Sequence, residues 1–313
     1  MTTLTLPQIG APTEARSKAL RLPKRFAPLE ARELADRLAE LRNRFRFASI
    51  LTPPDANLKL ARDGAAAALT LAPAATSGLE VCPHRSDACS RACVLWNAGH
   101  GRRSSVRDAR IGRTLAIAED PQAMLSGIVI EAHRLARAAT PIRGLRLNCA
   151  SDLPWERIEG FLDALPKGIA LYDYTKVAAR VGELGQAKGA TRPYRLAFSI
   201  SERAGSVESA LAVLERGGSA VLVVAGARRR GAGGAYRYHP TPDAVRIAGR
   251  WYPAVSGDRS DRRDRDPFGS VVVLVGKGPL ELPSTGGERV GDRFALRVDS
   301  PDLHYKRGLR RGF

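Results

Sequence analysis

The sequence predicts an α/β protein whose mainly parallel sheet forms an open or closed (β/α) barrel-like structure. Short apolar segments alternate along the chain with segments of helical periodicity, which is the pattern of strands joined by crossover helices. Two of the apolar segments, 220–225 and 271–275, are almost continuously apolar, as expected for strands covered on both faces. At least six strands fit this alternation, and one barrel, closed or incomplete, explains them better than two separate domains.

The chain begins with a proline-containing segment and a helix. Residues 1–28 contain four prolines and show no apolar periodicity, which predicts a loose basic arm. From Leu29 to Phe45 apolar residues recur at spacings of three and four, with arginines largely between them. This pattern predicts an amphipathic helix, which Pro53 and Pro54 would stop. Such a basic helix more often covers a core, and contact with nucleic acid is the alternative.

The body of the chain then alternates between strands and helices. Strands are predicted at 68–71, 145–149, 169–174, 196–200, 220–225 and 271–275. Helices are predicted at 121–137, 155–165, 177–185 and 207–214. Asp120 before Pro121 is typical of a helix start, because the carboxylate can cap the first N–H groups and proline fits the first turn.

Residues 228–268 interrupt this alternation and predict an insertion. A β-hairpin is expected around 245–255, and a charged loop follows it. The aspartates of that loop alternate with arginines, and mutual neutralisation explains the alternation more simply than binding of a divalent metal. They are Asp258, Asp261, Asp264 and Asp266. We therefore expect a basic N-terminal arm and helix at 1–56, a barrel-like domain at 57–300 and a basic C-terminal tail at 301–313.

The charge balance is strongly basic. Fifty Lys and Arg against 32 Asp and Glu give a formal net charge of +18. Such a field favours association with nucleic acid by counterion release, although GC-rich codon usage would also enrich arginine. No apolar run is long enough for a membrane span, and the N-terminus lacks a secretion signal. We expect a cytoplasmic protein that has DNA or RNA as its partner and does not bind membranes.

Three of the four cysteines lie within twelve residues, and they predict a metal site. Cys82, Cys89 and Cys93 are surrounded by Pro and small polar or charged residues, which suits a loop that wraps an ion. Buried free thiols, the alternative, would be expected on apolar faces. The candidates for a fourth ligand are His84, His100 and Cys149.

The predicted metal is an iron–sulfur cluster, with zinc as the alternative. Three thiolates leave one iron of a four-iron cluster open for S-adenosylmethionine, whereas structural zinc commonly has four protein ligands. A cysteine loop after the first strand of a barrel has a position similar to that in radical S-adenosylmethionine enzymes. The spacing departs from theirs, because six residues separate the first two cysteines and three separate the next two. Their Gly-Gly-Glu-Pro motif is also missing after the second strand.

Polar residues follow the predicted strands at their carboxyl ends, where parallel α/β folds place their ligand sites. The candidate catalytic acid/base groups are Asp152, Asp173 and Lys176. The candidate cofactor-binding residues are Asn148, Ser151, Tyr172, Ser199 and Lys277. Loops are polar in any protein, but these segments are denser in reactive groups than most turns.

Two basic segments are candidates for nucleic-acid contact, because guanidinium groups fit phosphate oxygens. The first contains Arg102, Arg103, Arg107, Arg110 and Arg113. The second contains Arg228, Arg229 and Arg230, beside Tyr236 and Tyr238, whose rings can stack on bases. A solvated helix face is the alternative explanation for the first segment.

Together these features resemble the gene product 88 family of bacteriophages and prophages over about residues 57–278. The resemblance rests on Ala72-Pro73, Ser77-Gly78, Cys82-Pro83, Cys89, Cys93, Arg110, Arg113-Thr114, Arg146-Leu147-Asn148, Ser151-Asp152, Tyr172-Asp-Tyr-Thr-Lys176, Asp266-Pro267 and Lys277-Gly278. Many relatives have Tyr where this chain has Val94 and space the first two cysteines differently. The resemblance implies a mobile-element origin and carries over no catalytic role.

We therefore expect a phage-type or prophage-type metalloenzyme that acts on a nucleic acid or nucleotide through an iron–sulfur cluster and S-adenosylmethionine. A zinc-containing α/β-barrel nucleic-acid transglycosylase, with Asp152 or Asp173 as its nucleophile, is one alternative. A nucleic-acid-binding protein without catalytic activity, in which a metal fixes the loop, is the other.

Overall fold

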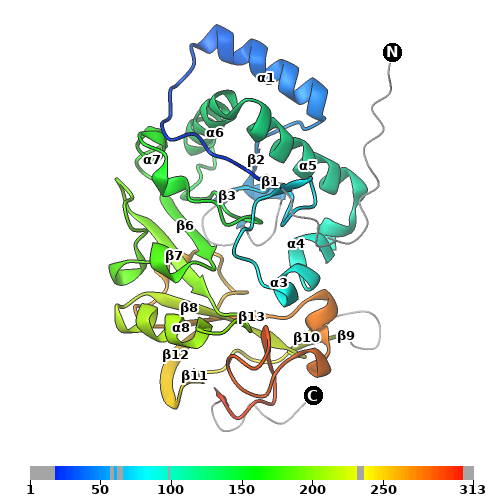
Figure 1. The fold of residues 1–313 in the computed structure, drawn as a ribbon, viewed down its shortest axis with the longest axis vertical. Coiled ribbons are helices and arrows are strands. Elements are labelled where there is room, and N and C mark those ends of the chain that lie inside the picture. Colours follow the sequence, from blue (N-terminus) through cyan, green and yellow to red (C-terminus); the bar gives the residue numbers. More distant parts are fainter. Residues whose placement is uncertain (1–17, 57–59, 62–65, 98, 231–235, 306–313) are drawn as a thin grey trace.

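The fold is organised around one large, mostly parallel sheet (Figure 1). The computed structural model describes residues 18–56, 60–61, 66–97, 99–230 and 236–305. Residues 1–17 of the predicted arm and 306–313 of the predicted tail lie outside this description. In the described part the main sheet has eleven strands. The prediction of an α/β protein with a mainly parallel sheet is confirmed.

Seven neighbouring strands form the parallel centre of the sheet. In spatial order they are β3 (Ala66–Leu69), β5 (Gly144–Arg146), β6 (Ala170–Thr175), β7 (Tyr194–Ser199), β8 (Ser219–Ala225), β13 (Val271–Val275) and β12 (Arg250–Ser256). The first five follow one another both in the chain and in the sheet, so the winding proceeds in one direction, as in a barrel. The sheet nevertheless has two free margins, and the described strands form no closed ring of hydrogen bonds.

Antiparallel strands complete both margins. β2 (Leu51–Thr52) pairs with β3, and β11 (Ala244–Ile247) lies between β12 and β15 (Leu303–His304). β14 (Ala295–Arg297) lies inside these margins and pairs in parallel with β8 at residues 223–225, beyond the point where β7 ends. Two small sheets stand apart, β1 (Lys18–Ala19) with β4 (Leu79–Glu80) and β9 (Arg228–Arg230) with β10 (Tyr236–Tyr238).

Four helices of ten or more residues pack against the sheet or one another. They are α1 (Ala31–Phe45), α5 (Ser104–Glu119), α6 (Pro121–Ala136) and α8 (Ser206–Glu215). The shorter helices are α3 (Asp87–Arg91), α4 (Val94–Asn97) and α7 (Phe161–Ala164). The 3₁₀ turns are η1 (Pro54–Ala56), η2 (Gly99–Arg102), η3 (Trp155–Arg157), η4 (Ala178–Arg180), η5 (Glu183–Gly185), η6 (Arg263–Arg265), η7 (Gly278–Glu281) and η8 (Pro283–Thr285). None of the described helices combines the length and apolar character needed to cross a membrane.

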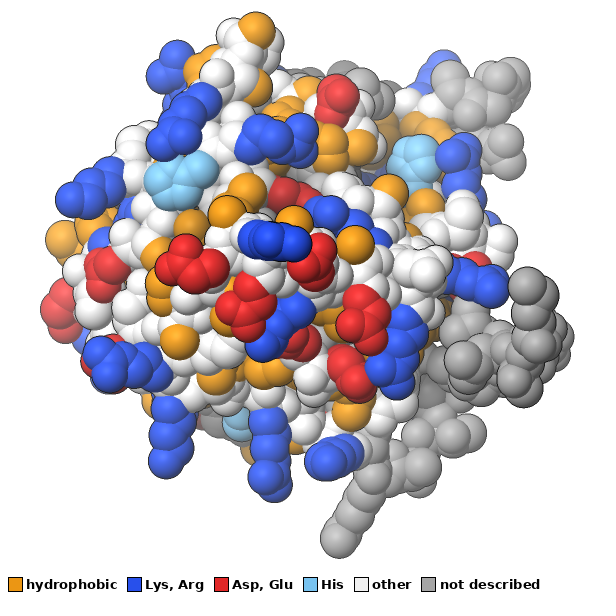
Figure 2. All heavy atoms as spheres, turned by 90° about the horizontal axis from the view of Figure 1, so that it is seen from above, with side chains coloured by type: hydrophobic (Ala, Val, Ile, Leu, Met, Phe, Trp, Pro, Cys, Tyr) orange, Lys and Arg blue, Asp and Glu red, His pale blue; other side chains and the backbone are white. Residues whose placement is uncertain are grey.

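Helix α1 covers the core, as its amphipathic pattern predicts. Leu34, Leu38 and Leu41 are buried in the main apolar cluster together with α5 and α6. On its outer side, Arg37 and Arg44 pair with acidic groups of α1 itself, α5 and the α5–α6 junction. Viewed from the α1 end, basic and acidic side chains are interleaved (Figure 2). Acidic side chains therefore offset part of the positive charge of this end.

Two helix predictions fail because the backbone leaves the helical conformation within the predicted segments. The segment predicted at 155–165 is split at Gly160 (φ +78) into η3 and α7. The segment predicted at 177–185 forms only η4 and η5, which Val181 and Gly182 separate with extended backbone. By contrast, α6 begins as predicted, since the Asp120 carboxylate accepts a hydrogen bond from the third residue of the helix.

The insertion contains the predicted hairpin, and its charged loop covers the sheet. Strands β11 and β12 form the hairpin, and η6 of the charged loop lies against β6 and β7. Within that loop Arg262 binds Asp264 through two nitrogens, at 2.7 and 2.6 Å, and Arg263 pairs with Asp266 at 3.3 Å. The prediction of mutual charge neutralisation is confirmed for these pairs.

Candidate active site at the carboxyl end of the sheet

The cysteine loop is fastened to the carboxyl ends of the parallel strands. Glu202, shortly after β7, accepts hydrogen bonds from Ser86 Oγ at 2.8 Å and from the N–H of Ala88 at 3.0 Å. After β5, the N–H of Asp152 donates to the carbonyl of Val81 at 2.8 Å. The loop therefore lies at the edge where parallel α/β proteins bind ligands.

Cys82, Cys89 and Cys93 share one partly buried neighbourhood. Burial raises the pKa of all three thiols, that of Cys93 to about 11, and the negative charges of Cys89 and Cys93 raise the pKa of Cys82 further. Such electrostatic coupling requires the thiols to be near neighbours. The raised pKa values favour the protonated thiols at neutral pH, because at Cys89 desolvation outweighs the nearby positive charges of Lys176 and Arg85.

In their present positions the three thiols do not form a set of metal ligands. Cys82 Sγ accepts a hydrogen bond from the N–H of Ala74 at 3.4 Å and lies 3.4 Å from the carbonyl oxygen of Ala150. Among the described residues, no group of three or more His, Cys, Asp or Glu side chains is placed so that it could hold a metal ion. Metal binding would require the thiols to turn toward a common centre. The iron–sulfur cluster with S-adenosylmethionine, and zinc as its alternative, stay predictions.

The candidates for a fourth ligand lie in different surroundings. His84 and His100 are exposed. Cys149 packs in a small apolar cluster around Tyr172, whereas Cys82 packs against the main core. None of the three candidates joins the thiols in a metal-binding group within the described part of the chain.

Lys176 follows β6 directly and brings a buried ammonium group beside the thiols. Its Nζ donates to Ser199 Oγ at 2.9 Å and to two backbone carbonyls. Burial lowers the pKa of Lys176, whereas the charges of Cys89 and Glu202 raise it. The ring of Phe294, next to β14, lies 4.9 Å from Nζ. A buried cation thus lies at the strand ends within the electrostatic range of Cys89.

Asp152 belongs to a buried ion-pair network that fixes the start of this segment. Its Oδ2 accepts a hydrogen bond from the backbone N–H of Lys176 at 2.8 Å, and its Oδ1 accepts one from Arg180 Nη1 at 2.5 Å. Arg180 also binds Glu156 through two nitrogens, at 2.7 and 2.9 Å. Asp152 is therefore placed to position Lys176.

Asp173 is wholly buried, at 0% exposure, and joins β5 to β6. Its Oδ2 accepts the N–H groups of Leu147 and Asn148, at 2.8 and 2.9 Å, and the hydroxyl of Tyr194 at 2.9 Å. Burial raises the pKa of Asp173 to about 6. The positive charge of Arg146 and the hydrogen bonds to the carboxylate act in the opposite direction and lower the pKa. These bonds also explain why β5 ends at residue 146, since the next two N–H groups leave the sheet ladder.

Asn148 and Ser151 build the turn after β5. Asn148 Oδ1 accepts hydrogen bonds from Ser151 Oγ at 2.8 Å, from the N–H of Leu153 at 2.9 Å and from Trp155 Nε1 at 3.0 Å. Both predicted cofactor-binding residues are buried and engaged in this turn.

The other predicted cofactor-binding residues are Tyr172, Lys277 and Ser199. Tyr172 precedes Asp173 in β6 and therefore faces the other side of the sheet. Lys277 follows β13, and its Nζ pairs with Asp258 at 3.1 Å. Ser199 does belong to the strand-end cluster.

Arg110 and Arg113 are buried, which removes them from the predicted basic surface. They are 8% and 7% exposed. Arg113 donates to the carbonyls of Thr70 and Ser49, both at 3.1 Å, and Arg110 donates to the carbonyl of Leu95. Burial lowers the pKa of both, that of Arg113 to about 10. These arginines tie α5 to neighbouring backbone.

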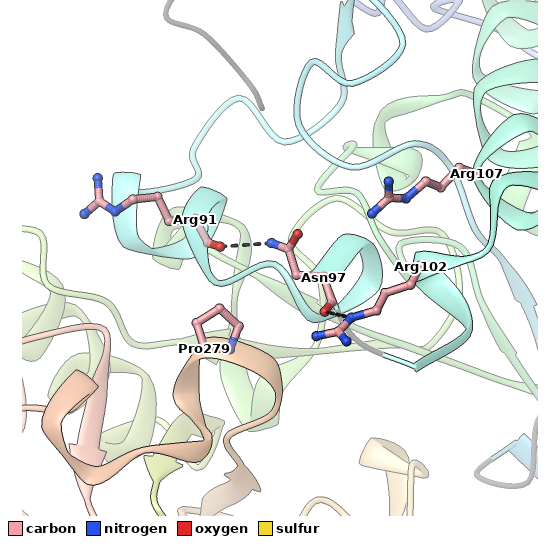
Figure 3. A pocket seen from close by; sticks show the side chains of 5 residues that line it. All are labelled: Arg91, Asn97, Arg102, Arg107 and Pro279. Atoms are coloured by element: carbon pink, nitrogen blue, oxygen red, sulfur yellow. Dashed lines mark hydrogen bonds between the residues drawn. The ribbon is translucent and has the colours of Figure 1, made fainter. Parts of the chain in front are cut away.

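A pocket of about 450 Å³ opens beside the cysteine loop. It is lined by Arg91, Asn97, Arg102, Arg107 and Pro279 (Figure 3). Arg102 Nε donates to the carbonyl of Asn97 at 2.8 Å. In Figure 3 the side chain of Arg91 lies across the pocket from Arg102, and its guanidinium points away from it.

Arg107 is held in place by neutral groups. It donates to the carbonyls of Gly101 and Trp96, at 2.8 and 2.7 Å, and its guanidinium lies 4.4 Å from the Trp96 ring. Within the described part of the chain, none of the three pocket arginines has a carboxylate within 4.0 Å. Arg103, at the start of α5, is exposed as well. The pocket therefore carries a positive charge that local acids do not offset.

The second basic segment forms strand β9. Arg228 pairs with Glu281 at 3.1 Å, and its guanidinium lies 3.4 Å from the centre of the Tyr236 ring. The side chains of Arg229 and Arg230 lie outside the described part of the structure.

The strand-end cluster and the pocket fall within a region that matches a known family. The model described as gene product 88 matches residues 49–290. The chain belongs to the gene product 88 family. No curated protein and no solved structure matches it. The positional similarity of this gene product 88 protein to radical S-adenosylmethionine enzymes therefore has no support from these comparisons.

Three residues of this gene product 88 site were given no role by sequence reasoning. Glu202 holds the cysteine loop, and hydrogen bonds from backbone N–H groups and Ser86 outweigh its partial burial and lower its pKa. Its position after a strand was a usable signal. The sequence gives no signal for the roles of Arg180 and Tyr194, because their hydrogen-bond partners are more than twenty residues away in the chain.

Proposed function

We propose that this protein is a nucleic-acid- or nucleotide-modifying enzyme whose centre comprises Cys82, Cys89, Cys93 and Lys176. The observation that carries this proposal is that three electrostatically coupled thiols, one of them also coupled to the buried ammonium of Lys176, lie in the loop fastened to the carboxyl ends of β5 and β7. Parallel α/β sheets bind their substrates at this edge. Soft thiols and a desolvated amine are reactive groups that a structural loop does not need.

The pocket beside the centre supports nucleic acid or nucleotides as substrates. Arg102 and Arg107 offer guanidinium groups to an anion, and neither is paired with an acid in the described part of the chain. Arg forks match phosphate oxygens, and the net charge of +18 concentrates polyanions around the protein. A phosphate bound there lies next to the cysteine loop.

The thiols are also the residues that would hold a metal, either an iron–sulfur cluster with S-adenosylmethionine or zinc. The donor type suits both, and the metal would supply redox or Lewis-acid chemistry. The arrangement of the side chains does not yet suit either, because no three of the described ligand groups converge. The residues themselves act independently of this question: Asp152 positions Lys176, and Glu202 positions the loop.

The transglycosylase alternative fits the carboxylates less well. Asp173 has no exposed surface and accepts three hydrogen bonds through one oxygen. Asp152 is also buried and is bound to Arg180. A nucleophile needs a free oxygen facing the substrate, so both residues are better suited to positioning.

The proposal is tested by nucleoside mass spectrometry of DNA, RNA and nucleotides from cells that express the protein. We expect a modified nucleoside with the wild type and a loss of at least about 100-fold with Cys89→Ser or Lys176→Gln, the size expected for a catalytic group. Both variants should bind nucleic acid as the wild type does. Cys149→Ser, a thiol outside the cluster, is the matched control and should retain activity.

A nucleic-acid-binding protein without catalytic activity would give a different result. If the wild type binds nucleic acid but leaves every nucleoside unchanged, the protein is a binding protein and the enzymatic proposal is wrong. Thermal melting of each variant separates loss of chemistry from loss of folding.

A further inference from the structure

We infer that the pocket and the β9–β10 hairpin together bind a single-stranded nucleic acid, with phosphates at the arginines and unpaired bases on the tyrosines. This inference rests on the proposed function and specifies the class of its substrate. It concerns binding, so its tests do not depend on whether the thiol centre is active.

The hairpin is fastened to a wall of the pocket. Arg228, in β9, pairs with Glu281 of η7 at 3.1 Å, and the N–H of Gly226 donates to the carbonyl of Leu280 at 3.2 Å. The same short turn contributes Pro279 to the pocket lining. A ligand that leaves the pocket past η7 therefore reaches the hairpin.

The hairpin presents two open aromatic rings. Tyr236 and Tyr238 are 41% and 52% exposed. They lie two residues apart in β10, so both rings project from the same face, about 7 Å apart. Arg228 stacks against Tyr236 and thereby steadies one ring. Rings displayed in this way form a stacking platform for bases.

A duplex cannot use this platform. Its base faces are stacked inside the helix, whereas the bases of a single strand are free to stack on aromatic side chains. The pocket arginines contact phosphates, which both forms of nucleic acid display. The tyrosines should therefore create the preference for single strands, and the arginines should act on both forms.

Fluorescence anisotropy of the full-length protein with a labelled 15-nucleotide DNA and its duplex tests the inference. We expect tighter binding of the single strand. Tyr238→Ala and Tyr236→Ala should each weaken single-strand binding by about 5-fold or more, with little effect on the duplex. Tyr236→Phe and Tyr238→Phe keep the rings and should bind as the wild type does.

The arginines are tested by salt dependence. Arg102→Ala/Arg107→Ala should weaken both ligands and reduce the slope of log affinity against log salt by about 0.7 per lost phosphate contact on the single strand. Arg32→Ala/Arg134→Ala removes two exposed arginines from α1 and α6, at the far end of the molecule, and should change neither slope nor preference. Duplex binding as tight as single-strand binding, or tyrosine-to-alanine variants without effect, would overturn the inference. Either result leaves the nucleoside test of the proposed function untouched.

Discussion

Asp173 illustrates how a strand-end carboxylate can serve the fold. Its Oδ2 satisfies two backbone N–H groups that the sheet ladder leaves free, and the Tyr194 hydroxyl points at the same oxygen. An unpaired N–H group in the core costs about 1–3 kcal/mol. The carboxylate therefore stabilises the end of β5, although its own desolvation raises its pKa to about 6.

Asp173→Asn should lower the free energy of unfolding by about 2–4 kcal/mol at pH 7, because the amide places N–H groups against existing donors. The raised pKa sets the pH dependence. The folded wild type takes up a proton between pH 6 and about 4, where the unfolded chain does not yet do so. Its stability relative to Asp173→Asn should therefore grow as pH falls through this range, by up to about 1.4 kcal/mol per pH unit.

Urea denaturation of both proteins from pH 7 to pH 4 measures this difference. Asp299→Asn is the matched control, because Asp299 is exposed and its pKa is lowered by its hydrogen bond with Arg297. Its small contribution should be lost as pH falls. A difference between wild type and Asp173→Asn that shrinks toward pH 4 would contradict the raised pKa.

At the scale of single residues, the sequence predicted which reactive side chains lie at the strand ends but not which groups they are hydrogen-bonded to. Cys82, Cys89, Cys93 and Lys176 were identified from their density and their place after strands. Whether Arg113 faces solvent or carbonyl groups depends on how α5 packs, which residue spacing does not encode. The local signal for an exposed and a buried arginine is the same.

Close packing of helices α1 and α5 depends on Gly112. A Cβ atom at this position would lie 2.0 Å from the carbonyl oxygen of Phe45 at the end of α1. The contact is with backbone, so a side-chain rotation cannot relieve it. Here glycine allows close approach and is not required for an unusual backbone conformation.

Gly112→Ala should therefore destabilise the protein by about 2–3 kcal/mol or more, despite the higher helix propensity of alanine. Thermal and urea denaturation measure the loss. Gly168→Ala is the matched control, because nothing lies within 4 Å of the new Cβ and its backbone is not left-handed. Equal stability of the two variants would show that α1 moves away from α5 without cost.

Elements with strong local signals were predictable. The leucine spacing of α1, the Asp120 cap of α6 and the apolar run of β13 each match the structure closely. The 177–185 segment failed because its helix-like composition conceals a left-handed Gly185 and an extended Gly182. Tertiary contacts, such as the N–H of Leu184 bonded to the carbonyl of Arg216, decide that region.

The whole protein can be tested for the predicted metal. Anaerobically purified wild type should be brown and contain about four irons if the iron–sulfur prediction is correct. Cys82→Ser/Cys89→Ser/Cys93→Ser should lose the colour and the iron. Cys149→Ser should keep both, because Cys149 packs in a separate cluster. Elemental analysis and visible absorption measure the outcome.

Two results would contradict the iron–sulfur prediction. A colourless protein with one zinc that depends on the same cysteines would replace it with the zinc alternative. A protein without metal would contradict both predictions and agree with the separate thiols of this structure.

The overall winding of the sheet could be predicted, but its margins could not. Strands β3, β5, β6, β7 and β8 lie in chain order, as alternating strands and helices imply. The parallel pairing of β12 with β13 and of β14 with β8 joins segments without any local signal for their register. The packing of η6 against β6 and β7 likewise arises only in three dimensions.

The place of Phe294 has a consequence for how the molecule is made. Phe294 lies over Lys176, and β14 follows it directly, after every parallel strand of the central seven has been synthesised. A nascent chain can thus assemble the sheet on the ribosome while its lysine is still open to water. The reactive edge is therefore completed late in synthesis, when Phe294 and β14 dock beside Lys176 and β8, and only β15 follows them in the chain.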